Sequence, residues 1–156
     1  FRAMQGLSSM QEKFGVLPPE QRQDLQDFSK FKQGVTTNLN KTIQEITGAA
    51  MSEPEAKRIG STVPNAGTGL FDGDSPTEFK AKMDETVRLI KLVEARNVYM
   101  LRKGYTLKDV SIDSMPQIIN DRGKEIAKEN NLNMNNPNNI ELIKRQLSAE
   151  FGITNQ

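Results

Sequence analysis

The sequence predicts an all-α protein, and three observations support this prediction. Apolar residues recur at three- and four-residue steps over long stretches of the chain. Glycine and proline gather between those stretches, where helices start and stop. The nearest strand signal, residues 110–112, is too short to build a sheet around. We therefore expect an elongated bundle or hairpin of long amphipathic helices with Gly- and Pro-rich connections.

Residues 1–48 are expected to form the N-terminal helices. A first helix occupies the residues before Gly15, and the prolines at positions 18 and 19 then break the pattern. A second, longer helix is expected at residues 19–47, where apolar residues occupy heptad-like positions. Gly34 in its middle costs about 1 kcal/mol relative to Ala, so packing must hold this segment helical.

Residues 49–75 are predicted to form a connection that contains one short helix. Ser52, Pro54 and Glu55 suit the start of a helical turn or two that reaches Ile59. The stretch that follows, residues 60–74, is about fifteen residues long, and loops of that length are often functional or mobile. We expect it to be mobile.

Residues 76–104 carry the strongest helix signal, and the rest of the chain is organised around them. Ser75 is a suitable N-cap, Pro76 fits the first helical position, and Glu78 completes a capping box. Gly104 can close the last turn in the left-handed conformation. A helix at 76–103 spans roughly 40 Å at 1.5 Å per residue. We expect it to pack antiparallel to the 19–47 helix or to splay from it.

Residues 105–156 are expected to form two shorter helices. The first, at 116–129, opens after Ser114, and Gly123 is a candidate break within it. The second, at 137–151, opens at Asn136 and ends at Gly152. Between them, seven of the ten residues from 130 to 139 are Asn, a composition that favours turns and helix caps.

The composition predicts a single helical region, residues 1–156, with a thin core. Only 35% of the 156 residues are hydrophobic, and the mean hydropathy is −0.62. Each helix therefore has a narrow stripe to bury, and a homo-oligomer is expected. The chain begins at Phe1, without an initiator Met and inside a helix-like pattern, so we expect it to be a fragment of a longer protein.

Most catalytic and metal-binding chemistry is excluded by residue type. The chain has no His and no Cys, which removes His-dependent triads, thiol nucleophiles and thiolate metal sites. The glycine-rich stretch 67–75 lacks the Lys of a phosphate-binding loop. Asp72 and Asp74 lack the later ligand positions of a calcium loop and are expected to favour the positive end of the following helix. The sequence thus predicts no catalytic residue, no metal site and no cofactor.

A local excess of positive charge marks the end of the central helix. The net charge of the chain is +1, yet residues 88–108 contain six Lys and Arg residues and one carboxylate, Glu94. The plain interpretation is that these cations complement the negative end of the helix dipole. The alternative is that Arg96, Arg102 and Lys103 make weak, sequence-independent contacts with DNA phosphates in an assembled form.

Residues 51–104 resemble a known group of proteins. The order MSEPEAKRIGSTVPN, a glycine-rich gap, DSPTEFKAKMDETVRLI and a basic, Tyr-containing helix end is similar to the DNA-injection proteins of short-tailed bacteriophages of enteric bacteria. The resemblance covers about a third of the chain and supplies no catalytic residue. It implies an internal virion protein that is ejected with the genome, with the other ejected proteins and the tail as partners. It also implies assembly in the host envelope into a conduit for double-stranded DNA.

Two other functions stay open. Injection machinery can include a murein-cleaving activity that uses a single catalytic Glu, for which Glu45, Glu53 and Glu94 are the candidates. A generic helical scaffold without any connection to DNA is the other alternative. The conduit is our leading prediction because the resemblance implies it. Long helices with thin apolar stripes are compatible with a subunit that oligomerises.

Overall fold

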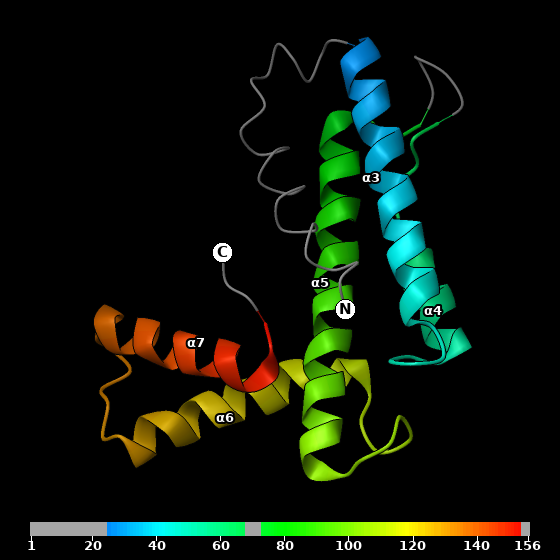
Figure 1. Ribbon diagram of the computed structural model, residues 1–156. Helices are drawn as coiled ribbons and strands as arrows, with labels where there is room; N and C mark the ends of the chain where they lie inside the picture. Colours follow the sequence, from blue (N-terminus) through cyan, green and yellow to red (C-terminus); the bar gives the residue numbers. More distant parts are fainter. Residues whose placement is uncertain (1–24, 68–72, 154–156) are drawn as a thin grey trace. The chain divides into compact units, whose positions relative to one another are not determined.

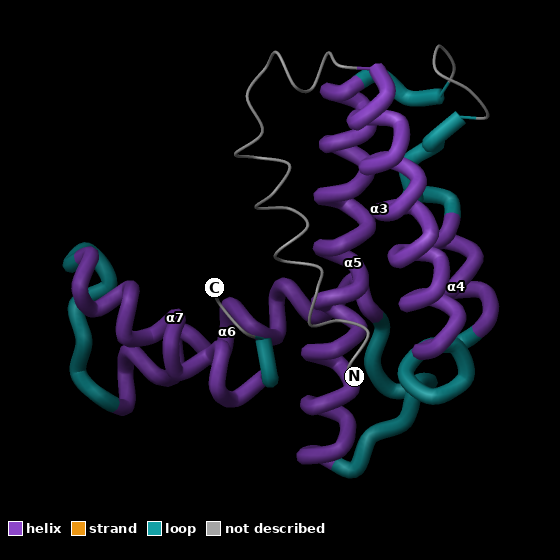
Figure 2. The backbone as a smooth tube through the Cα atoms, turned by 45° about the horizontal axis from the view of Figure 1, so that its top comes forward, coloured by secondary structure: helices purple, strands orange, loops and turns teal. Residues whose placement is uncertain are grey.

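In the computed structural model, residues 25–67 and 73–153 are described, and all of their regular structure is helical (Figures 1 and 2). The all-α prediction is confirmed for these residues. The helix expected before Gly15 and the predicted start of the second helix lie outside them. The chain divides into two compact units, Phe1–Ile90 and Lys91–Gln156, with the boundary inside helix α5.

The first unit contains α3 (Leu25–Ile46), α4 (Glu53–Gly60) and the first part of α5 (Pro76–Lys103). Its buried apolar side chains come from all three helices and include Leu39, Ile59 and Phe79. The rings of Phe31 and Phe79, each near the start of its helix, lie 6.4 Å apart. The two long helices therefore run side by side in the same direction (Figure 1).

The antiparallel packing expected for the two long helices is thus wrong. Helix α4 is the reason, because it and the connection after it carry the chain back before α5 begins (Figure 1). That connection is held to α3 by a hydrogen bond of 3.3 Å from the Thr36 hydroxyl to the Pro64 carbonyl. Residues 68–72 of the predicted mobile loop lie outside the described residues.

The starts of α4 and α5 have the predicted capping boxes. Ser52 and Glu55 cap each other's backbone N–H groups at the start of α4. At the start of α5, the Ser75 N–H donates to Glu78 Oε2 over 3.0 Å, and the Glu78 N–H donates to Ser75 Oγ over 3.3 Å. These caps satisfy backbone donors that the helix itself leaves without partners.

The second unit contains the last part of α5, the 3₁₀ turn η2 (Ile112–Ser114), α6 (Met115–Glu129) and α7 (Pro137–Phe151). Gly104, at φ +71°, ends α5 in the predicted left-handed conformation, and Gly152 ends α7 at φ +65°. A buried cluster joins these elements: Ala95, Met100, Val110, Met115 and Phe151.

Helices α6 and α7 pack against each other and run in opposite directions (Figure 1). Gly123 does not break α6; it is buried where the two helices meet. A Cβ atom at this position would lie 3.3 Å from Leu147 Cδ1 and 3.5 Å from Ile143 Cγ2. The Asn-rich tract forms the turn between the helices, with Asn131 at φ +53° and Asn136 as the N-cap of α7.

Candidate functional site

The predicted contact residues Arg102 and Lys103 occupy the last turn of α5, and both are exposed. Their position follows from the sequence, because cations are favoured at a helix C-terminus and Gly104 ends the helix directly after them. The structure therefore brings these two of the three predicted residues together on one surface. Their predicted contact with DNA stays a prediction.

Arg96, the third predicted residue, lies elsewhere. Its side chain is fully buried, and Nη1 donates a hydrogen bond of 3.3 Å to the Val110 carbonyl. A phosphate group needs an accessible cation, so this geometry separates Arg96 from the surface of Arg102 and Lys103. The sequence spacing could have indicated that Arg96 is buried. Arg96 lies three residues after Val93 and four before Met100, and both of these are buried in the same helix.

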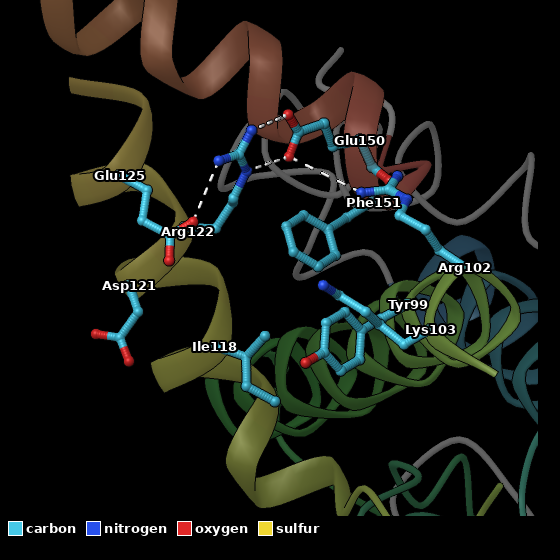
Figure 3. A pocket seen from close by; sticks show the side chains of 9 residues that line it. All are labelled: Tyr99, Arg102, Lys103, Ile118, Asp121, Arg122, Glu125, Glu150 and Phe151. Carbon is cyan, nitrogen blue, oxygen red and sulfur yellow. Dashed lines mark hydrogen bonds and ion pairs between the residues drawn. The ribbon is translucent and has the colours of Figure 1, made fainter. Parts of the chain in front are cut away.

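Arg102 and Lys103 line an open cleft of about 620 Å³ between the end of α5, α6 and α7 (Figure 3). Pockets of this size hold small ligands in many proteins. The residues around the cleft come from all three helices and combine aromatic, aliphatic and charged side chains. They are Tyr99, Arg102, Lys103, Ile118, Asp121, Arg122, Glu125, Glu150 and Phe151.

An ionic network centred on Arg122 joins α6 to α7 at the edge of the cleft (Figure 3). Arg122 Nε and Nη2 each donate to one carboxylate oxygen of Glu150 over 2.8 Å. Its Nη1 donates to Glu125 over 3.2 Å and to Glu129 over 3.1 Å. The hydrogen bond from Arg122 lowers the pKa of Glu150, and the same bond raises the pKa of the guanidinium.

Arg102 joins this network from α5. Its Nη2 donates to the backbone carbonyl of Glu150, and its Nη1 lies 3.9 Å from the Glu150 carboxylate. The three cations of the cleft thus face three carboxylates, those of Asp121, Glu125 and Glu150. Their formal charges cancel, so the cleft as a whole does not attract a polyanion strongly.

Aromatic side chains form one wall of the cleft. The rings of Tyr99 and Phe151 are stacked, with their centroids 6.3 Å apart. The ring of Tyr105 lies 5.8 Å from that of Tyr99 in a tilted arrangement. Tyr99 and Phe151 belong to the apolar cluster of the second unit, so their main role is packing.

The three candidate catalytic carboxylates lie on three different helices. Glu45 on α3 is exposed and lies 3.9 Å from the ammonium of Lys41, while Glu53 is exposed at the start of α4. Glu94 on α5 is half-buried, and burial raises its pKa, against the opposing effect of Lys91. The surroundings of Glu94 thus raise its pKa above the usual value.

Asp74 has a structural partner on each carboxylate oxygen. Oδ2 accepts the Asn65 N–H over 2.7 Å, and Oδ1 accepts from the Lys82 ammonium over 2.8 Å. Burial raises the pKa of Asp74, but the Lys82 and Asn65 hydrogen bonds outweigh it and leave that pKa below its usual value. Asp74 therefore holds Asn65, in the connection, close to the start of α5. Asp72 lies outside the described residues.

Among residues 25–67 and 73–153, no cluster of acidic side chains with metal-site geometry is found. The helices in these ranges also include none that is both long and apolar enough to span a bilayer. Comparisons with protein-family models, with curated protein sequences and with solved structures found no match to this chain.

Proposed function

We propose that the chain is a structural subunit of a bacteriophage DNA-injection apparatus. In this proposal the protein resides inside the virion, leaves through the tail with the other ejected proteins, and assembles in the host envelope. There it forms an elongated, homo-oligomeric helical bundle that conducts double-stranded DNA. Contact with the host envelope is part of this proposal.

The main support for the proposal comes from where the residues of the sequence resemblance lie in the fold. The EPEAKRI sequence is α4, begun by the Ser52 capping box. The VPN sequence that follows ends at Asn65, whose N–H and carbonyl both bond to Asp74. DSPTEFKAK then starts α5. The residues of the resemblance thus include a short helix, a turn closed by Asp74 and the capped start of the long helix.

A second supporting observation is that the helices leave apolar surface uncovered. Leu142 on α7 is 52% exposed. Large exposed aliphatic side chains next to charged ones are typical of surfaces that another protein covers. An oligomer would bury Leu142, in keeping with the thin apolar stripes of the sequence.

The decisive experiment follows the protein through infection by the virus that encodes it. Quantitative mass spectrometry of purified particles before and after DNA release should find the protein in full particles and lose it from emptied ones. Fractionation of freshly infected cells should then recover it with the envelope as a large oligomer. A protein that stays in emptied particles, or that never enters particles, would rule the proposal out and favour a general scaffold.

A murein-cleaving enzyme is the second candidate, because the raised pKa of Glu94 is what a general acid requires. The test is digestion of purified murein by the full-length protein and by Glu94→Gln. If the protein cleaves murein with Glu94 as its general acid, then Glu94→Gln abolishes release of muropeptides. Glu53→Gln, at an exposed position, does not. Absence of release by the parent protein would eliminate the murein-cleaving function. Equal release from all three proteins would eliminate Glu94 as its catalytic residue.

A further inference from the structure

Helix α7 carries an exposed stripe opposite its packed face. Glu141, Leu142 and Arg145 are all exposed, and at 100° per residue they fall within about 100° of the helix circumference. The stripe thus combines one aliphatic side chain, 52% exposed, with a carboxylate and a guanidinium beside it. Nothing among the described residues covers Leu142.

The cleft between α5, α6 and α7 offers the complementary groups. Tyr99 and Ile118 are half-buried and form an apolar base (Figure 3). Lys103, on the α5 side, makes no ion pair with any residue that the structure describes. Asp121, on the α6 side, accepts one hydrogen bond of 2.7 Å from Gln117 on Oδ1 and retains capacity on its other oxygen.

We infer that this cleft binds the α7 stripe of a second copy of the chain. Leu142 of one copy covers Tyr99 and Ile118 of the next. The Glu141 carboxylate is then available to Lys103, and the Arg145 guanidinium to Asp121. A nucleic acid fits less well, because the cleft carries as many carboxylates as cations, whereas a stripe with both signs matches it.

The stripe and the cleft lie on opposite sides of α7, which determines the kind of assembly. Glu141 and Glu150 are nine residues apart, as are Leu142 and Phe151, and nine residues correspond to about 180° around a helix. One copy therefore uses its cleft toward one neighbour and its stripe toward another. Such a head-to-tail contact yields a closed ring or an open filament, rather than a twofold dimer. The inference rests on the proposed homo-oligomer and specifies its surfaces.

The test uses the full chain in light scattering coupled to size-exclusion chromatography over a concentration series. Leu142→Gln removes the aliphatic group of the stripe, and Lys103→Glu reverses the charge at the cleft. Each should weaken association about tenfold or more, since truncating a central contact costs at least 1.4 kcal/mol. The controls are Leu101→Gln, an exposed leucine outside both surfaces, and Lys108→Glu, an exposed charge reversal. Both should associate like the parent.

An equimolar mixture of the Leu142→Gln and Lys103→Glu proteins is the most specific test of the head-to-tail contact. The Leu142→Gln copy keeps an intact cleft and the Lys103→Glu copy keeps an intact stripe, so an equimolar mixture should form one-to-one dimers and nothing larger. The charge swap Lys103→Glu/Glu141→Lys should recover the parent's association. Unchanged association in both single variants, a monomeric parent at every concentration, or a mixture without dimers would overturn the inference. None of these outcomes bears on whether the protein leaves the virion, so the proposed function is tested separately.

Discussion

Arg122 on α6 and Glu150 on α7 are joined by two parallel hydrogen bonds, each 2.8 Å long. Their side chains are only 27% and 20% exposed, unlike the surface pair of Arg88 and Glu85 at 54% and 44%. Bidentate pairs of arginine and carboxylate are stronger and more directional than single-contact ion pairs. The link therefore fixes how α6 and α7 meet at the edge of the cleft.

A double-mutant cycle measures the strength of this link. Combining Arg122→Met with Glu150→Gln should give a coupling free energy of about 1–2 kcal/mol in urea unfolding, reduced from that of a fully buried pair by solvent screening. The same cycle on Arg88 and Glu85 should give less than about 0.5 kcal/mol because both groups are exposed. Equal coupling in the two cycles would show that the Arg122 pair adds no special stability.

The same pair predicts how stability depends on pH. The folded state lowers the pKa of Glu150 below its ordinary value of 4.5. The stabilisation is therefore complete above pH 4.5 and is lost as the pH falls through the lower, folded-state pKa. Glu150→Gln should be less stable than the parent at pH 7, and the difference should shrink as the pH falls below 4.5. A difference that stays constant over this range in urea titrations would contradict the assignment.

Two glycines inside helices should respond oppositely to substitution. Gly34 in α3 has open space around it, so Gly34→Ala should stabilise the protein by about 1 kcal/mol through helix propensity. Gly123 in α6 faces Leu147 and Ile143, so Gly123→Leu should destabilise it by about 1–3 kcal/mol through overpacking. Thermal unfolding measures the change in stability that each of the two substitutions causes. If Gly123→Leu is tolerated as well as Gly34→Ala, then α6 and α7 do not approach each other closely.

Phe79 and Ile90 test the core of the first unit. Both are fully buried on α5. Phe79→Ala and Ile90→Ala should each destabilise the protein by about 2–5 kcal/mol, because each leaves a cavity. Leu101→Ala, at a position 78% exposed on the same helix, is the matched control and should cost less than about 0.5 kcal/mol. If both core variants unfold like the parent, then the apolar face of α5 that contains Phe79 and Ile90 packs against a partner and not in the core of this chain.

DNA binding by the full-length assembly tests the role of Arg102 and Lys103. Each lost phosphate contact should lower the slope of log affinity against log salt by about 0.9. Both changes should have a small effect in the assembly, because Arg102 is already engaged by Glu150 and Lys103 is inferred to meet Glu141 of a neighbouring copy. Lys108→Gln, exposed and outside the cleft, is the control. If the oligomer stays intact and the slope of the Arg102→Gln/Lys103→Gln variant matches the parent's, then these cations serve only as complements of the helix end.

The helices were predictable because their boundaries are set by local chemistry. The capping boxes at Ser52 and Ser75 act within four residues, and the left-handed glycines at 104 and 152 follow from their own backbone freedom. The helices expected at 76–103 and 137–151 have those bounds in the structure, and the one expected at 116–129 begins one residue earlier. Burial of Gly123 could not be predicted, because a glycine that breaks a helix and one that admits a neighbour look alike in sequence.

The candidate site was less predictable because it depends on residues far apart in the chain. Arg122 and Glu150 are separated by 28 residues, and neither belongs to a local pattern that involves the other. The cleft exists only once α6 and α7 meet the end of α5. The parallel course of α3 and α5 was missed for a related reason, since the direction of a helix depends on the path of the connection before it.

The two capping boxes also bear on how the chain regains its structure after being stretched. A helix whose first turn is stabilised by its own residues can begin again wherever those few residues come together, without waiting for a distant segment to arrive. Structure that depends on near neighbours in sequence forms quickly, since little loop-closure entropy is lost. The segments that begin at Ser52 and Ser75 can therefore regain their first helical turns without contacts from distant parts of the chain.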